Sequence, residues 1–302
     1  MSDAVTIDLE FFGKEQVIAA FLIPAPEGGF VLLDTGPGST LEALEAGVAA
    51  AGHGPGNLRG IFVTHVHLDH AGAAGELSRR TGAPVWVHPE GARHMADPSR
   101  LLASAARLYG SAMDMLWGTM EPVPEDLLRT VEHGETVTVA GLGVTGWYTP
   151  GHARHHVAWQ VGTQLATGDV GGLRMPGSAH VLPPTPPPDI DVATWRESLG
   201  LIRGLGVEKL LVTHFGIHGD VERHLDDLDR RLVRWWELAT ETLAAGGDVG
   251  TVEALLTEMD DTEMSAGGIG GEIRERYRAA CPMPMNAAGL VHAWERADST
   301  GA

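Results

Sequence analysis

The residues best suited to bind a metal ion lie together in one short stretch of the first quarter of the chain. Thr64–His70 reads THVHLDH and directly follows a short apolar run. Imidazole nitrogens and carboxylate oxygens are common protein ligands for divalent cations. Alternation along an extended segment projects His65 and His67 to the same side, whereas Asp69 and His70 curl back as the next helix begins. One turn can therefore serve two adjacent metal ions.

Further ligands must come from other parts of the chain, because one turn cannot complete either site. The sequence offers three more places where a histidine or aspartate directly follows a β-like run. These residues are His152 in TPGH, Asp169 in TGD and His214 in VTH. Each lies where a loop is expected to leave a sheet, so the three side chains can converge on the first cluster.

The order HxHxDH, His, Asp, His resembles the signature of the metallo-β-lactamase-fold hydrolases, over roughly residues 17–216. Within that superfamily the chain is similar to the glyoxalase II-like and lactonase-like branch. The resemblance implies two divalent metal ions as cofactors, with Zn²⁺ favoured over Fe or Mn. It also implies that Asp34, in LLDTG, supports the ligand turn through hydrogen bonds. By the same resemblance, His65, His67 and His152 would hold the first metal, Asp69, His70 and His214 the second, and Asp169 would bridge both.

The resemblance implies an α/β fold, the αββα sandwich of two mixed β-sheets flanked by helices, with a C-terminal helical extension. The pattern of the chain agrees, because short β-branched runs alternate with helical patches in the first part and helical periodicity dominates after it. We expect a metallo-β-lactamase-fold domain at residues 1–218 and the extension at 219–302. An apolar helical insertion at 99–120 and a Pro-rich loop at 180–190 interrupt the first part. The expected strands are 17–23, 30–33, 61–64, 85–87, 136–139, 144–148, 156–161, 164–167 and 209–213, and the expected helices include 39–50, 71–80, 221–243, 252–259 and 287–297.

The chemistry of such a site favours hydrolysis. A hydroxide between two divalent ions forms near neutral pH, beside an electrophile that the metals polarise. Asp69 is the expected catalytic residue, because its free oxygen would orient that hydroxide and pass a proton to the leaving group. We therefore expect a hydrolase of a small-molecule ester, thioester or lactone. No substrate-binding residue is identifiable, but the apolar insertion, with Met113 and Trp117, and the Pro-rich loop would lie over the site and favour a partly hydrophobic substrate.

Other functions stay open at this point. A mononuclear Fe(II) persulfide dioxygenase shares the fold and would use His65, His152 and Asp169. A phosphodiesterase or ribonuclease has the full ligand set, but a formal net charge of −19 disfavours an RNA substrate. A metal-sensing or scaffold protein would carry the ligands without turnover. A true β-lactamase is disfavoured, because lactamases with this motif generally lack the carboxylate that Asp169 supplies.

The composition is that of an acidic globular protein, with 302 residues of which 43% are hydrophobic and 20% charged. The single cysteine, Cys281, cannot form an internal disulfide, and a reducing compartment is compatible with that. No signal-peptide pattern or membrane span is found, so we expect a cytoplasmic protein without membrane contact. The expected partner is a small-molecule substrate, with no nucleic acid. Trp235 and Trp236 are adjacent on a predicted helix, so one of the two rings must lie off its main apolar face. A ring in that position makes a homodimer plausible.

Overall fold

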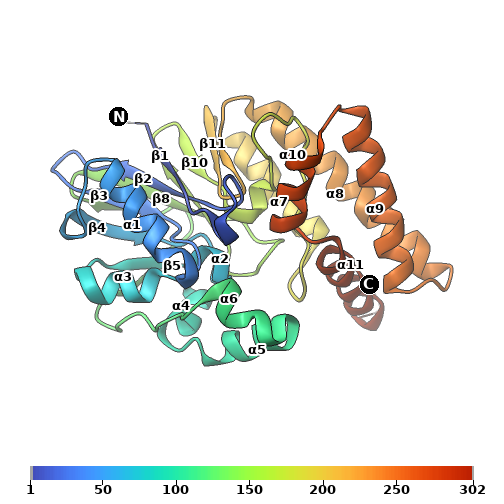
Figure 1. The fold of residues 1–302 in the computed structure, drawn as a ribbon, viewed down its shortest axis with the longest axis horizontal. Helices are drawn as coiled ribbons and strands as arrows, with labels where there is room; N and C mark the ends of the chain where they lie inside the picture. The colour runs from blue at the N-terminus through green and yellow to red at the C-terminus, as the bar shows by residue number, and fades with distance from the viewer. Residues whose placement is uncertain (1–2, 301–302) are drawn as a thin grey trace.

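Two six-stranded mixed β-sheets form the centre of the computed structural model, which describes residues 3–300 (Figure 1). The first sheet has the strand order β1-β2-β3-β4-β5-β6, and the second has the order β12-β11-β10-β9-β8-β7. The strands are β1 (Val5–Asp8), β2 (Ala19–Pro24), β3 (Phe30–Leu33), β4 (Leu58–Phe62), β5 (Val85–Val87), β6 (Leu128–Thr130), β7 (Thr136–Val139), β8 (Leu142–Tyr148), β9 (Val157–Val161), β10 (Gln164–Ala166), β11 (Lys209–Val212) and β12 (Gly216–His218). The α-helices are α1 (Leu41–Ala50), α2 (Leu68–Ala71), α3 (Ala74–Thr81), α4 (Pro89–Ala96), α5 (Ser99–Tyr109), α6 (Met113–Trp117), α7 (Val192–Gly204), α8 (Val221–Ala244), α9 (Val249–Ala266), α10 (Gly271–Ala280) and α11 (Met283–Thr300). Short 3-10 helices occur at η1 (Phe11–Gly13), η2 (Gly38–Thr40), η3 (Pro55–Asn57), η4 (Gly110–Ala112) and η5 (Gly168–Gly171).

The central strands of the first sheet are buried on both faces. In β2, Phe21 and Ile23 belong to the core shared with the second sheet, whereas Ala20 and Leu22 belong to the core under the helices on the opposite face. Strands β3 to β6 pair in parallel, while β1 and β2 add an antiparallel edge. Strands buried on both faces read as continuous apolar runs, which is why β2 and β3 could be predicted from the sequence.

The two sheets pack face to face through large aromatic side chains. The ring of Phe62 on β4 lies 5.0 Å from the ring of Trp159 on β9, measured between centroids. The indole nitrogen of Trp159 donates a hydrogen bond of 3.0 Å to the carbonyl of Val63. This bond satisfies a polar group that would otherwise be buried without a partner, and it ties the second sheet to the segment that precedes the histidine motif.

Helices cover the outer face of each sheet. Leu44 of α1 and Leu77 of α3 pack into the core outside the first sheet, and Trp195 of α7 and Leu228 of α8 pack into the core of the second. In Figure 1, α1 and α3 lie at the left and α8, α9 and α11 at the right of the sheets. The layers therefore form the αββα sandwich with C-terminal helices that the sequence predicted.

The C-terminal helices are continuous with the second core. Leu225, Leu232, Trp235 and Ala239 are fully buried along one face of α8, as the sequence periodicity predicted. Trp236 is half-buried and packs against the same core. The division of the chain at residue 218 and the homodimer both stay predictions. No helix among residues 3–300 combines the length and apolar character needed to cross a membrane.

Several elements differ in extent from the sequence-based expectation. The helix expected at 71–80 is divided into α2 and α3. Gly72, between them, lies close to another segment, since a Cβ there would be 2.8 Å from Cα of Pro37. The helix expected at 252–259 is longer, and Asp248 caps it by accepting a hydrogen bond of 2.9 Å from the Thr251 amide. The helix expected at 287–297 likewise extends over α11. The short strands β1, β6 and β12 and the helix α10 were not predicted.

Candidate metal centre

All the predicted metal ligands lie at the ends of strands on one side of the sandwich. The motif residues occupy the turn between β4 and α2 and the first turn of α2 itself. His152 lies in the loop between β8 and β9, Asp169 in η5 after β10, and His214 directly after β11. The structure brings these seven residues together, and we refer to them as the ligand cluster: His65, His67, Asp69, His70, His152, Asp169 and His214.

Two glycines allow the chain to deliver its ligands. Gly151, just before His152, has a φ of +127°, and a Cβ there would lie 2.3 Å from Cα of Trp195. Gly168, just before Asp169, has a φ of +47°, and its Cβ would lie 2.7 Å from Oγ1 of Thr64. Only glycine satisfies both the left-handed backbone and the close approach at these positions.

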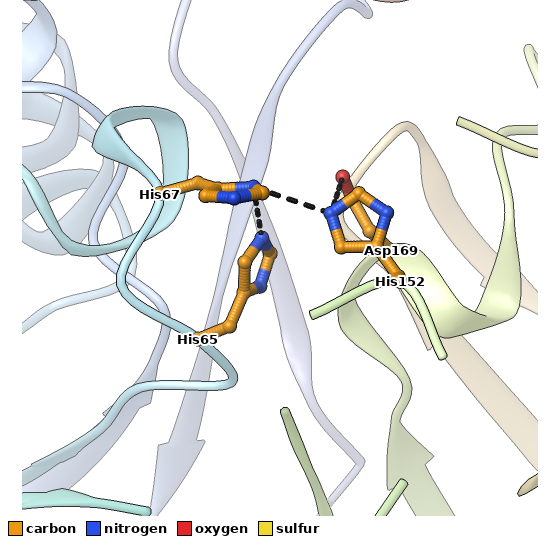
Figure 2. A group of neighbouring side chains, drawn as sticks. All are labelled: His65, His67, His152 and Asp169. Atoms are coloured by element: carbon orange, nitrogen blue, oxygen red, sulfur yellow. Dashed lines mark hydrogen bonds and ion pairs between the residues drawn. The ribbon is translucent and has the colours of Figure 1, made fainter. Parts of the chain in front are cut away.

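The first group of ligand atoms contains three histidines and one aspartate (Figure 2). Nε2 of His65 lies 2.9 Å from Nδ1 of His67, and Nε2 of His152 lies 3.2 Å from the same His67 atom. Oδ2 of Asp169 lies 3.3 Å from Nε2 of His152. The four ligand atoms of this group are all within 4.8 Å of one another.

The second group consists of Asp69, His70 and His214, whose ligand atoms also lie within 4.8 Å of one another. Oδ2 of Asp69 is 3.8 Å from Nε2 of His70 and 3.4 Å from Nε2 of His214. Oδ1 of Asp169 is 3.1 Å from Nε2 of His70 and 3.5 Å from Nε2 of His214. Asp169 thus directs one carboxylate oxygen to each group.

The outer nitrogens of the histidines are held by acceptors that fix the tautomer. Nδ1 of His152 lies 2.9 Å from the carbonyl of Pro184, and Nδ1 of His214 lies 2.9 Å from the carbonyl of Val17. A carbonyl only accepts, so Nδ1 carries the proton of each neutral ring, and Nε2 is the nitrogen left to bind a cation. Hydrogen bonds of this kind are typical around metal-binding histidines.

Asp34 holds the ligand turn through four contacts. Its Oδ1 accepts from the Thr64 amide at 2.8 Å, and its Oδ2 accepts from the hydroxyls of Thr64 at 2.9 Å and Thr213 at 3.1 Å. Oδ2 also lies 2.7 Å from Nδ1 of His70. The backbone φ of Asp34 is +55°, a left-handed conformation that aspartate tolerates better than most residues. The sequence placed Asp34 behind the turn, and its contacts agree with that position.

The electrostatics of the cluster favour ionised carboxylates and a neutral His67. Burial, with the neighbouring His152, lowers the pKa of His67 to about 4, so this ring is neutral at physiological pH. Burial alone would raise the pKa of Asp69, but the attraction of His70 and a hydrogen bond with His214 bring it down to about 2. Ionised carboxylates and neutral imidazoles are the forms that bind metals. Burial lowers the pKa of His70 and His214, but the neighbouring Asp169 and Asp69 outweigh it and raise both pKa values, so a metal bound there must displace a proton.

Two buried polar atoms in the ligand cluster indicate that a cation fits there. Nε2 of His70 and Oδ1 of Asp169 have no hydrogen-bond partner among the described residues, although they are 3.1 Å apart. Buried polar atoms in folded proteins are normally satisfied by a partner. The imidazole and carboxylate ligands converge here from separate strands, and these two buried atoms have no hydrogen-bond partner within residues 3–300. Both features fit a bound divalent cation.

A cavity of about 410 Å³ opens onto the cluster at His67, Asp69 and Asp169. Its other surfaces come from four segments far apart in the sequence, which we call the apolar wall: Phe11–Phe12, the helices α5 and α6, Pro184–Pro188, and residues 279–286. Trp117 lines the cavity, as expected for the insertion. Met113 is not among the lining residues and packs instead against the core of the first sheet.

The sequence identified no substrate-contacting residue, and the structure supplies a candidate in Tyr109. Its ring packs edge-on against Trp117, with 5.1 Å between centroids, and its side chain lines the cavity together with Asp69. Burial and the negative charge of Asp69 raise the pKa of Tyr109 to about 12, so the phenol keeps its proton. Within residues 3–300 its hydroxyl has no recorded hydrogen bond. In the sequence Tyr109 was one of many apolar residues at helical spacing, and nothing distinguished it.

Comparison with known proteins extends these observations. The family model of the metallo-beta-lactamase superfamily matches residues 14–214. A metallo-beta-lactamase fold-containing protein of Sulfurisphaera tokodaii is 34% identical over 142 residues, which are 46% of this chain and 53% of that protein. A hydroxyacylglutathione hydrolase of Shewanella pealeana is 27% identical over 148 residues, 48% of this chain and 43% of that enzyme. The matched region thus spans about half the length of these relatives.

Likeness among solved structures concerns the fold. The crystal structure of a metallo-beta-lactamase family protein from Thermus thermophilus superposes with a TM-score of 0.67 at 22% identity, covering 99% of this chain and 94% of the other. The family-model match covers both the histidine turn and the later ligand positions up to His214. The chain therefore belongs to the metallo-beta-lactamase superfamily.

Proposed function

We propose that this protein is a metal-dependent hydrolase of a small-molecule ester, thioester or lactone. The observation that carries the proposal is the position of Asp169, whose Oδ2 faces His152 at 3.3 Å and whose Oδ1 faces His70 at 3.1 Å. A carboxylate placed in this way suits a pair of adjacent cations rather than a single one. The relative from Shewanella pealeana, named a hydroxyacylglutathione hydrolase, is in keeping with cleavage of an acyl bond.

The residues that would hold the cofactor form the two groups of the ligand cluster. His65, His67 and His152 would bind one ion, Asp69, His70 and His214 the other, and Asp169 both. Bound there, two divalent ions, Zn²⁺ by preference and Fe or Mn as alternatives, would supply a hydroxide near neutral pH and polarise a carbonyl oxygen.

Asp69 is suited to proton transfer in this reaction. Its Oδ2 faces His70 and His214, whereas its Oδ1 has no recorded partner in the described part of the chain. The side chain also lines the cavity, so a substrate bound there would lie beside this carboxylate. With a pKa of about 2 the carboxylate is ionised, and it can accept a proton from the attacking water and pass it to the leaving group.

Tyr109, which also lines the cavity, is suited to binding the substrate. Because its phenol stays protonated, it can donate a hydrogen bond to a substrate oxygen as negative charge develops there. The edge-on contact with Trp117 supports the ring of Tyr109, and a supported ring loses less entropy when the substrate binds.

The proposal is tested by metal content and turnover in the same preparation. We expect about two equivalents of metal per chain by elemental mass spectrometry, and hydrolysis of at least one ester, thioester or lactone in a panel. Asp169→Ala should lower kcat/KM by about 10³-fold, equivalent to about 4 kcal/mol, and reduce the metal content. Asp126→Asn, at an exposed position outside the cavity, is the matched control and should change neither.

Other outcomes would contradict the proposal in distinct ways. One equivalent of iron per chain, with oxygen uptake in the presence of a persulfide, would show a mononuclear dioxygenase. Hydrolysis of bis(p-nitrophenyl) phosphate in preference to every acyl substrate would show a phosphodiesterase. A metal-loaded protein without any turnover would favour a sensing or scaffold role.

A further inference from the structure

The cavity beside the ligand cluster is chemically asymmetric. Over residues 3–300, the carboxylate and imidazole groups that line it are limited to His67, Asp69 and Asp169, at the end near the metal ligands. The phenol of Tyr109 and the thiol of Cys281 also line it, and both are neutral because burial raises their pKa to about 12. The greater part of the surface comes from leucine, alanine, proline, methionine and aromatic side chains. Among the described residues, no lysine or arginine lines the cavity. The end away from the ligands is therefore apolar and has no cation to pair with an anionic group.

The cavity is pre-formed, because its wall segments are fixed to one another. Oδ1 of Asn286, at the start of α11, accepts a hydrogen bond of 2.8 Å from the amide of Thr185 in the Pro-rich loop. On the opposite side, the ring of Trp117 stacks on Phe11 with 5.7 Å between centroids. Its volume of about 410 Å³ is within the usual range for sites that bind small molecules.

The apolar surface continues past the cavity to solvent. Phe12 and Leu108 line the cavity and are 47% and 51% exposed, respectively. They are exposed large apolar side chains on a protein whose formal net charge is −19. Single exposed apolar residues are common, but two at the edge of one apolar cavity extend the surface on which a hydrocarbon chain can lie.

An anionic substrate arm would meet unfavourable conditions here. Burying a carboxylate among apolar side chains without a cationic partner is costly. A glutathionyl group carries two carboxylates, and the wall offers neither of them a basic side chain. An uncharged hydrocarbon arm is buried from water on the same surface, and this burial stabilises its binding.

We propose that the non-reacting arm of the substrate is an uncharged apolar chain, seated between α5 and the junction of α10 with α11. This inference rests on the proposed hydrolase function and names its substrate class: an acyl ester, thioester or lactone with a medium to long hydrocarbon chain, not a glutathione conjugate. Leu108 and Ala280, on opposite sides of the cavity, determine the chain length accepted.

A kinetic experiment tests the specificity. Purified full-length protein is assayed with p-nitrophenyl esters of acyl chains of increasing length and with lactoylglutathione. We expect kcat/KM to rise by about threefold to fourfold for each methylene that becomes buried. Ala280→Phe should lower kcat/KM for the octanoyl ester by at least about tenfold more than for the acetyl ester, because the larger ring fills space that only a long chain uses. Ala50→Phe, at an exposed position at the end of α1, is the matched control and should preserve the chain-length profile.

A binding experiment separates this inference from the hydrolase proposal. The neutral fluorophore N-phenyl-1-naphthylamine is bound to the protein and displaced with 1-decanol, which requires no turnover. Leu108→Glu should weaken 1-decanol binding by about tenfold, whereas Leu255→Glu, at a similarly exposed leucine on α9, should not change it. Because Leu108 is exposed, its replacement leaves folding intact, and a circular dichroism spectrum checks this.

The outcomes distinguish the two proposals. Binding of 1-decanol that depends on Leu108, without hydrolysis of any panel substrate, supports the apolar site and overturns the hydrolase. Hydrolysis with no chain-length preference, or with lactoylglutathione preferred over the octanoyl ester, overturns the apolar site and supports the hydrolase. Loss of 1-decanol binding in both glutamate variants also overturns the site, because the effect would then not be local to the cavity.

Discussion

The ligand cluster and the apolar wall meet in one cavity, but different forces hold them. In the cluster, Nδ1 of His70, His152 and His214 each has an acceptor within 2.9 Å, supplied by a carboxylate or a backbone carbonyl. The wall is assembled from four sequence-distant segments, mainly by contact between apolar side chains. Hydrogen bonds are directional and fix atoms to tenths of an ångström, whereas apolar packing constrains volume and shape.

This difference separates reactivity from selectivity in the molecule. Changes in the cluster should affect metal binding and the chemical step for every substrate alike. Changes in the wall should alter which substrate is preferred and leave metal binding intact. The following substitutions test that separation, from the largest expected effect to the smallest.

Asp34→Asn should weaken metal binding although Asp34 is not a predicted ligand. The substitution keeps the shape and the tolerance for a left-handed backbone, but it places an amide group among the donors of Thr64, Thr213 and His70. We expect metal affinity to fall by about 10–100-fold, measured by competition with a chromogenic chelator.

Substrate preference is the control in this experiment. After saturation with metal, Asp34→Asn should show the chain-length profile of the unmodified protein. A changed profile with unchanged metal affinity would mean that cluster and wall are not independent.

Tyr109→Phe tests a residue that belongs to the wall but carries a polar group. Removing only the hydroxyl should lower kcat by about tenfold, the loss expected for one hydrogen bond of about 1.4 kcal/mol. Stopped-flow kinetics should show the same factor for short and long acyl chains, since the ring and its contact with Trp117 are retained. An effect on KM for long chains alone would assign Tyr109 to packing instead of substrate activation.

Asp227→Asn tests whether a distant network supports the wall. Arg231, which is only 2% exposed, lies 2.8 Å from Oδ2 of Asp227 and 2.7 Å from Oε2 of Glu263, and Asp227 also accepts from the Val181 amide. The network joins α8 and α9 to the start of the Pro-rich loop at Val181. We expect the free energy of unfolding at pH 7 to fall by about 1 kcal/mol, measured by urea titration.

The pH dependence of that effect has a defined sign. Burial tends to raise the pKa of Asp227, but Arg231 outweighs it and lowers the pKa to about 2. The folded state therefore holds this proton less tightly than the unfolded chain, and the stabilisation is complete above about pH 4. It is lost as the pH falls toward 2, so the difference in unfolding free energy between the two proteins should shrink over that interval. A difference that stays constant with pH would show that Asp227 acts through shape and not through charge.

The ligand cluster could be predicted from the sequence because its signals are local. The predicted ligands follow β4, β8, β10 and β11, whose apolar residues are recognisable in the sequence, and the spacing from His65 to His70 places four ligands in one turn. Asp34 was recognised through its motif, although its contact with Thr213 crosses 179 positions of the chain.

The apolar wall could be predicted only in part, because its signals are not local. The insertion and the Pro-rich loop were expected above the site, but Ala280 and Asn286 reach the cavity only through the packing of α10 and α11. Met113 and Trp117 have the same spacing signal and both lie in α6, yet only Trp117 lines the cavity, while Met113 packs against the core of the first sheet. The strands β1, β6 and β12 are short and partly exposed, so their sequences carry little periodic pattern.

The contacts of Asp34 also bear on how the protein can be divided. Asp34 follows β3 of the first sheet, while Thr213 follows β11 of the second, and their side chains form a buried hydrogen bond of 3.1 Å. A fragment that ended between the two sheets would lack Thr213, which donates to this carboxylate. It would also expose the apolar face at which Phe62 and Trp159 pack. We therefore expect the two halves to fold as one cooperative unit, and we expect neither to persist as an autonomous module after gene splitting or limited proteolysis.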